Sequence, residues 1–123
     1  MVVEDDRDIQ QALCSVLREE GYDVSSASNG RDAITQLVAG PRPGVILLDV
    51  IMPVMGGADF RQAQLRDPGL KDIPVFVLTA EGAIHDIARA LGAAAAFPKP
   101  FDLDALLDAI ERVMPPDRPV AGA

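Results

Sequence analysis

Cysteine and aromatic residues are scarce in this sequence of 123 residues. It contains one cysteine, Cys14, one tyrosine, four phenylalanines and no tryptophan. A single thiol cannot form an intramolecular disulfide, which is typical of a protein kept in a reducing intracellular compartment. So few aromatic rings also disfavour a stacking platform for single-stranded nucleic acid.

Positive charge is scarce as well. Eleven lysines and arginines face nineteen aspartates and glutamates, which gives a formal net charge of −8 at pH 7. Because nucleic-acid affinity depends on Lys and Arg neutralising phosphates, we expect no direct nucleic-acid binding by this chain. The acidic balance instead suits cations and basic partner surfaces.

Long apolar runs are missing. No stretch approaches the roughly 20 residues that a membrane-spanning helix requires. The acidic run over 4–6 directly follows the first apolar residues, which argues against a signal peptide. We therefore expect a cytoplasmic protein without membrane association. Hydrophobic residues still make up 49% of the chain, enough for one domain, expected over 1–114 with a proline-rich tail or linker over 115–123.

Short apolar runs alternate with helical patterns along this domain. Apolar or β-branched runs predict strands at 1–3, 24–27, 45–48, 75–78 and 94–98. Apolar residues at spacings of three and four predict helices around 9–17, 33–38, 58–66, 84–91 and 103–110. Five such units predict an α/β fold with a doubly wound, five-stranded parallel sheet and helices on both faces. Its natural strand order is the flavodoxin-like 2-1-3-4-5.

Polar side chains follow four of the expected strands. The acidic run over 4–6 follows the first strand, and the third, fourth and fifth strands are followed by Asp49, Thr79 and Lys99. In an open α/β sheet, ligands bind outside the carboxyl ends of the strands, so we expect these side chains to share one pocket. Crowded carboxylates require either raised pKa values or a cation, and a cluster of hard oxygen ligands suits Mg²⁺. With a lysine and a hydroxyl beside it, the pocket suits phosphoryl transfer to a carboxylate, and Asp49 on the central strand is the natural acceptor.

Most of these signals have a simpler interpretation when taken alone. The acidic run can be the first turn of a helix, Thr79 can satisfy a strand end, and Lys99 can be a surface lysine. Asp49 is harder to dismiss, because an acid directly after four buried apolar residues is costly unless it is paired or coordinated. Taken together, the four strand ends favour a shared site.

Four motifs in the sequence carry a resemblance to a known family. They are Val2-Val3-Glu4-Asp5-Asp6, Leu47-Leu48-Asp49-Val50-Ile51-Met52-Pro53, Val77-Leu78-Thr79-Ala80 and Lys99-Pro100-Phe101. In this order and spacing they resemble the response-regulator receiver domain of two-component signal transduction, over residues 2–113.

The resemblance implies a phosphoacceptor site that binds a metal ion. Asp49 would accept a phosphoryl group from a sensor histidine kinase or a phosphotransfer protein. Glu4, Asp5, Asp49 and the backbone carbonyl of Ile51 would bind Mg²⁺, whereas Asp6 would cap the first helix.

The resemblance also implies how the signal is handled. Thr79 and Lys99 would contact the phosphoryl oxygens, and the Lys99–Pro100 bond would be cis. The domain would be a regulator that speeds only its own phosphorylation and dephosphorylation, not an enzyme with a separate substrate. Its output would be altered contacts with an unknown protein or with a removed C-terminal effector domain. A receiver homodimer would use the helices over 84–91 and 103–110.

Two positions depart from the family pattern. Receivers usually carry an aromatic residue three positions before the lysine, where this sequence has Ala96 followed by Phe97. We therefore expect that Thr79 is not coupled to an aromatic switch in the usual way and that Phe97 lies in the core. The loop after the phosphoacceptor usually reads Met-Asp-Gly, and Gly56 before Gly57 is expected to make this loop more permissive.

Residues outside the motifs point to structural roles. Arg61 and Gln64 interrupt the apolar stripe of the helix over 58–66. His85, the only histidine, is expected on the surface, and Cys14 is expected in the core as a small hydrophobic residue.

Two alternatives to the phosphoacceptor interpretation stay open. The first is a degenerate receiver that acts as a phosphorylation-independent interaction module, which Ala96 and Gly56 favour and the costly acidic cluster opposes. The second is a flavodoxin-like cofactor binder, whose phosphate-binding first loop the acidic run over 4–6 would disfavour by repulsion.

Overall fold

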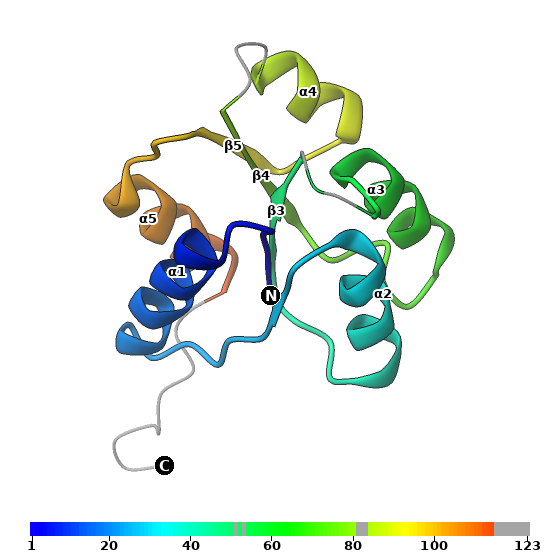
Figure 1. Ribbon diagram of the computed structural model, residues 1–123, viewed down its shortest axis with the longest axis horizontal. Helices are drawn as coiled ribbons and strands as arrows, with labels where there is room; N and C mark the ends of the chain where they lie inside the picture. Colours follow the sequence, from blue (N-terminus) through cyan, green and yellow to red (C-terminus); the bar gives the residue numbers. More distant parts are fainter. Residues whose placement is uncertain (51, 53, 81–83, 115–123) are drawn as a thin grey trace.

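Five parallel strands form the centre of the computed structural model, which describes residues 1–50, 52, 54–80 and 84–114 (Figure 1). The strands are β1 (Val2–Val3), β2 (Ser26–Ala27), β3 (Ile46–Asp49), β4 (Val75–Thr79) and β5 (Ala95–Pro98). Their order in the sheet is β2-β1-β3-β4-β5. The helices between them are α1 (Arg7–Glu19), α2 (Gly30–Ala39), α3 (Gly57–Arg66), α4 (Ile84–Leu91) and α5 (Leu103–Val113). The predicted fold class and strand order are confirmed.

Helices cover both faces of the sheet (Figure 1). Leu47 in β3 packs with buried residues of α1 and α5, whereas its neighbours Ile46 and Leu48 pack with residues of α2 and α3. Because successive side chains of a strand point to opposite faces, both faces of β3 are buried and its sequence is continuously apolar. This two-sided burial explains why an apolar run marked the central strands in the sequence.

One apolar residue expected in the core lies at the surface. Ala33 and Leu37 in α2 are buried, whereas Val38 is 67% exposed. Helix α2 packs near the edge strand β2, where a narrow stripe at a spacing of four residues is enough to cover the sheet. The structure confirms two other predictions, because Cys14 is buried and His85 is exposed.

The two polar residues that interrupt the apolar stripe of α3 make hydrogen bonds to the backbone of nearby connecting segments. The Gln64 side chain is fully buried, and its Nε2 donates hydrogen bonds of 2.9 Å to the carbonyls of Leu70 and Ile73. Its Oε1 accepts from the Arg61 guanidinium at 2.7 Å. Gln64 therefore satisfies the backbone of the connection to β4, which an apolar side chain cannot do.

Arg61 connects α3 to the end of α4. Its Nε donates to the carbonyl of Leu91 at 2.8 Å, and a terminal nitrogen donates to the carbonyl of Gly92 at 3.1 Å. These carbonyls belong to the last turn of a helix, where backbone acceptors lack intrahelical partners. A cation is also favoured at this end of the helix dipole.

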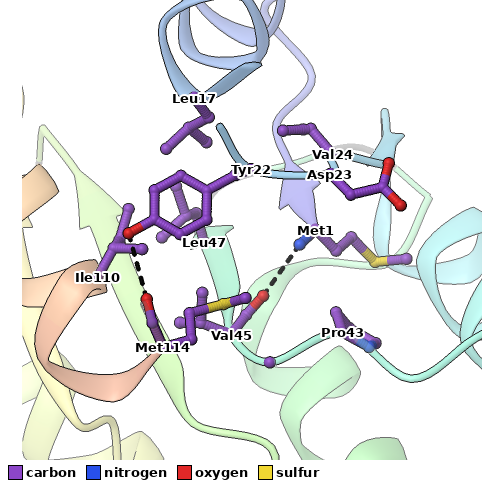
Figure 2. Close-up of a pocket in the computed structure, with 11 residues that line it drawn as sticks. Met1, Leu17, Tyr22, Asp23, Val24, Pro43, Val45, Leu47, Ile110 and Met114 are labelled. Atoms are coloured by element: carbon purple, nitrogen blue, oxygen red, sulfur yellow. Dashed lines mark hydrogen bonds between the residues drawn. The ribbon is translucent and has the colours of Figure 1, made fainter. Parts of the chain in front are cut away.

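A small cavity of about 50 Å³ lies at the amino end of the sheet (Figure 2). Beside it, the Tyr22 hydroxyl donates to the carbonyl of Met114 at 3.2 Å, and the Met1 amino group donates to the carbonyl of Val45 at 2.9 Å. The expected site residues lie at the opposite, carboxyl end of the strands, so this cavity is not part of that site. Among the described residues, we find no helix long and apolar enough to cross a membrane.

Candidate functional site

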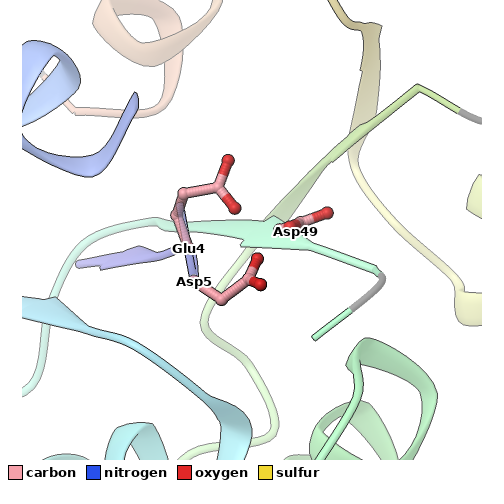
Figure 3. Close-up of side chains that lie close together, drawn as sticks. All are labelled: Glu4, Asp5 and Asp49. Atoms are coloured by element: carbon pink, nitrogen blue, oxygen red, sulfur yellow. The ribbon is translucent and has the colours of Figure 1, made fainter. Parts of the chain in front are cut away.

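Three carboxylates meet at the carboxyl end of the sheet (Figure 3). Glu4, Asp5 and Asp49 each contribute an oxygen atom, and these atoms all lie within 4.8 Å of one another. Glu4 and Asp5 directly follow β1, and Asp49 is the last residue of the neighbouring strand β3. Glu4 and Asp49 are buried, whereas Asp5 is exposed. Because these neighbouring parallel strands end at the same edge of the sheet, Asp5 and Asp49 come together although they are 44 positions apart in the sequence.

Lys99, which follows β5, provides the positive charge of the cluster. Its Nζ lies 2.5 Å from Glu4 Oε1 and 3.4 Å from Asp49 Oδ2. Burial by itself lowers the pKa of Lys99, but the hydrogen bond with Glu4 and the charge of Asp49 outweigh it and raise the pKa. The ammonium group therefore stays protonated at neutral pH. The Lys99–Pro100 peptide bond is cis, as the resemblance implied.

The second carboxylate oxygen of Glu4 lacks a partner. Glu4 Oε2 is buried, and no hydrogen bond to it is found in the part of the chain that the structure describes. Such an oxygen is unusual, because a buried polar atom that makes no hydrogen bond has lost its contacts with water and gained nothing in their place. One lysine also faces three carboxylates. The unsatisfied oxygen and the all-oxygen donor set both fit a hard divalent cation such as Mg²⁺.

The other expected site residues are found at the end of β4, at the start of α1 and outside the described residues. Thr79 is buried as the last residue of β4, and its carbonyl accepts a 2.9 Å hydrogen bond from the amide of Lys99. Asp6 points its side chain to the start of α1, where Oδ1 accepts from the amides of Asp8 and Ile9. Ile51, whose carbonyl was expected to bind the metal, is outside the described residues.

Comparison with known proteins agrees with this arrangement. The response regulator receiver domain family matches residues 1–111. This chain belongs to that family. The response regulator MprA of Mycolicibacterium vanbaalenii is 38% identical over 125 residues, which cover all of this chain and 53% of that protein. The chain thus spans about half the length of the curated relatives it matches.

Solved structures of similar proteins have the same fold. The chemotaxis response regulator CheY4 of Vibrio cholerae is 34% identical, with a TM-score of 0.81 over 92% of this chain and 95% of CheY4. The response regulator TrrA of Thermotoga maritima, solved in complex with Mg²⁺–BeF, is 26% identical, with a TM-score of 0.80 over 92% of this chain and 96% of TrrA. Receiver domains are generally phosphoacceptor regulators that bind Mg²⁺ at an acidic pocket, and the cluster of this chain is compatible with that property.

The loop after β3 needs a glycine at one of its two glycine positions. The amide of Gly57 donates to the carbonyl of Val50 at 2.9 Å, and a Cβ on Gly57 would lie 2.8 Å from Val50 Cα. Gly56 has an ordinary φ of −76°, and a Cβ there would meet its nearest atom at 3.4 Å. Gly57 is therefore required by close packing beside the acidic cluster, whereas Gly56 occupies a conformation that other residues adopt readily.

Phe97 and Ala96 lie on opposite faces of the sheet. Ala96 is paired with Val77, whose side chain belongs to the core beneath α2 and α3, and Ala96 itself is half-buried. The Phe97 ring packs against Phe76 on the face covered by α1 and α5, with ring centroids 5.9 Å apart. Phe97 is therefore packed against the core, as expected. It cannot substitute for an aromatic side chain at position 96, because neighbouring residues of a strand face opposite sides.

The sequence analysis missed Gln10 in α1. Its Nε2 donates hydrogen bonds to the carbonyl of Glu4 at 2.9 Å and to the carbonyl of Ala27 at 3.0 Å. The available signal was a polar residue three positions before Leu13, which places it beside the buried stripe of the helix. That signal indicates half-burial but does not identify the carbonyls that the amide reaches.

Proposed function

We propose that this receiver domain accepts a phosphoryl group on Asp49 in the presence of Mg²⁺ and thereby changes its contacts with other proteins. The observation that carries the proposal is the buried cluster of Glu4 and Asp49, which has Lys99 on one side and an unsatisfied Glu4 oxygen on the other. A pocket that holds this much negative charge is costly for a purely structural purpose.

The chemistry is a displacement at phosphorus. A carboxylate oxygen of Asp49 attacks the phosphorus atom of the donor, the bond between phosphorus and the leaving group breaks, and the leaving group departs with that electron pair. The Lys99 ammonium and the Thr79 hydroxyl contact the phosphoryl oxygens. When bound by Glu4, Asp5, Asp49 and the carbonyl of Ile51, Mg²⁺ supplies further neutralisation of the phosphoryl oxygens. The same residues also support self-dephosphorylation, in which water attacks the phosphorus atom, the bond to the Asp49 oxygen breaks and inorganic phosphate leaves.

A sensor histidine kinase or a phosphotransfer protein is the proposed donor. An apolar groove beside Lys99 supports a macromolecular donor, because it presents apolar side chains next to the pocket. It is formed by α1 and the segment before α5, and its lining includes Ile9, Val16, Phe101 and Leu103. A protein that seats on this groove reaches the edge of the acidic cluster.

The output is proposed to pass through protein contacts. Residues 1–114 form the receiver domain in this proposal, and 115–123 form a tail or linker. Because the curated relatives are about twice as long, an effector domain outside this sequence is one carrier of the output and a separate protein is the other. A homodimer through α4 and α5 is a further proposed contact. Phosphorylation adds charge that shifts the balance between two conformations of the domain.

A degenerate receiver that needs no phosphorylation is the second candidate. The half-buried Ala96 favours it, since position 96 has no ring that could report phosphorylation to the surface. The two candidates differ in one respect that can be measured directly, namely whether Asp49 takes up a phosphoryl group.

The test is intact-mass measurement after incubation with acetyl phosphate and Mg²⁺. We expect the wild type to gain one phosphoryl group, since acetate is the leaving group and Asp49 is the acceptor. Asp49→Asn should gain none. Asp59→Asn, an exposed aspartate on α3, is the matched control and should be labelled like the wild type. Chelation of Mg²⁺ should abolish labelling. A folded wild type that gains no mass, while a control receiver is labelled, would favour the phosphorylation-independent module.

A further inference from the structure

Gln10 joins the carboxyl ends of two strands beside the acidic cluster. Its Nε2 donates to the carbonyls of Glu4 and Ala27, at 2.9 and 3.0 Å. Carbonyl oxygens only accept hydrogen bonds, so the amide nitrogen and not the amide oxygen must face these two atoms. The Ser28 hydroxyl oxygen lies farther from Nε2, at 3.5 Å, so the two shorter hydrogen bonds of this amide go to backbone at the strand ends.

This amide restrains the peptide unit that carries the two metal-binding candidates. The amide of Glu4 donates to the carbonyl of Ala27 at 3.0 Å, and the carbonyl of Glu4 accepts from Gln10. The peptide between Glu4 and Asp5 is therefore held at its oxygen by α1, after β1 itself has ended. Since the Asp5 side chain is exposed, few packing contacts restrain it, and its orientation depends mainly on the conformation of its own backbone.

We propose that Gln10 is a positioning residue for Mg²⁺ binding by Glu4 and Asp5, an inference that rests on the proposed function. Gln10 acts through the backbone carbonyl of Glu4 and does not touch the metal. By holding this peptide before the metal arrives, it removes the cost of ordering the two carboxylates during binding. Residues that orient metal ligands in this way typically change metal affinity by about 10- to 100-fold when they are replaced.

The test compares Gln10 with the next residue of the same helix. Gln10→Met keeps a side chain of similar length without donors, and Gln11→Met makes the same change at an exposed position. Mg²⁺ dissociation constants are measured by isothermal titration calorimetry, and thermal unfolding is measured without Mg²⁺. We expect Gln10→Met to weaken Mg²⁺ binding about 10-fold, and Gln11→Met to leave it unchanged. The backbone amide NMR signal of Asp5 should shift in the metal-free Gln10→Met protein alone.

A second pair of variants tests for rescue by hydrogen-bond donors. Gln10→Arg keeps N–H donors near the two carbonyls, and Gln11→Arg adds the same charge without them. The two variants have the same net charge, and high salt screens the charge at position 10, which lies nearer to the acidic cluster, so in high salt we expect equal Mg²⁺ affinity in these two proteins. This pair also keeps the inference testable if Gln10→Met does not fold.

Two outcomes would overturn the positioning role of Gln10, and a third would overturn the proposed function instead. Equal Mg²⁺ affinity of Gln10→Met and Gln11→Met, with a normal wild type, would refute the positioning role. A lower unfolding temperature of Gln10→Met with unchanged affinity would refute it too, because it would leave only a structural role. A folded wild type that binds no Mg²⁺ would instead refute the proposed function.

Discussion

Two adjacent aspartates carry the same charge but have different surroundings. Asp5 contributes an oxygen to the cluster with Glu4 and Asp49, whereas Asp6 accepts hydrogen bonds of 3.0 and 3.1 Å at the start of α1. The difference arises because Asp6 occupies the N-cap, where a side-chain oxygen satisfies backbone amides of the first helical turn. Two consecutive residues thus have different roles, the first as a candidate metal ligand and the second as a helix cap.

Replacement of each aspartate by asparagine tests this division. Mg²⁺ at 100 times its dissociation constant should stabilise the wild type by about 2.7 kcal/mol, since it binds only the folded state. Asp5→Asn should lose most of this stabilisation. Asp6→Asn should keep it, because asparagine is also a good N-cap. Thermal unfolding with and without Mg²⁺ measures the effect, and an equal loss in both variants would contradict the assignment.

At the scale of whole elements, a side chain of α3 makes hydrogen bonds to the end of α4. The Arg61 side chain reaches the carbonyls of Leu91 and Gly92 at the end of α4, while Gln64 holds the connection to β4. Burial lowers the pKa of Arg61, but these bonds are made by its charged form. The last turn of α4 is thus attached to α3.

Removal of this connection should loosen α4 at one end. Arg61→Ala should speed amide hydrogen exchange over residues 88–93 and lower the free energy of unfolding by about 1–2 kcal/mol, because charged hydrogen bonds to carbonyls are lost. Arg66→Ala, an exposed arginine at the end of α3, is the matched control and should change neither quantity. Exchange that is unaltered in Arg61→Ala would show that other contacts hold this turn.

At the scale of the whole molecule, Lys99 is a cation within an acidic site of an acidic chain. It lies between Glu4 and Asp49 in a chain whose net charge is −8. Its pKa is raised above the usual 10.5, so the folded state binds this proton more tightly than the unfolded state. By linkage, the resulting stabilisation is fully present below about pH 10.5 and is lost as the pH rises through the higher folded-state pKa.

Loss of this cation should therefore destabilise the protein across the neutral range. Lys99→Met leaves two buried carboxylates without their counter-charge and should lower the free energy of unfolding by about 1–3 kcal/mol, less than for a fully buried pair. Mg²⁺ should restore part of the loss. Urea unfolding measured from pH 7 upward should show that the difference in free energy of unfolding between the wild type and Lys99→Met decreases above about pH 10.5. Lys71→Met, at an exposed position, should resemble the wild type throughout.

Much of the fold and of the candidate site was predictable from sequence. The β3 and β4 runs are apolar because both faces of the sheet are covered, so their short length and continuous apolar character indicate buried strands. The meeting of Glu4, Asp49 and Lys99 follows from topology, because neighbouring parallel strands end at the same edge. Boundaries were less predictable at β2, a two-residue edge strand expected to span 24–27.

The architecture and the set of side chains at the carboxyl edge can be inferred from local periodicity and from the order of the strands. The backbone atoms that Gln10, Arg61 and Gln64 reach, and the oxygen of Glu4 that stays unsatisfied, become visible only in the folded molecule. The physical reason is that a hydrogen bond requires particular atoms within about 3 Å. Periodicity reports only the face of an element on which a residue lies, whereas those atoms belong to segments brought together by folding.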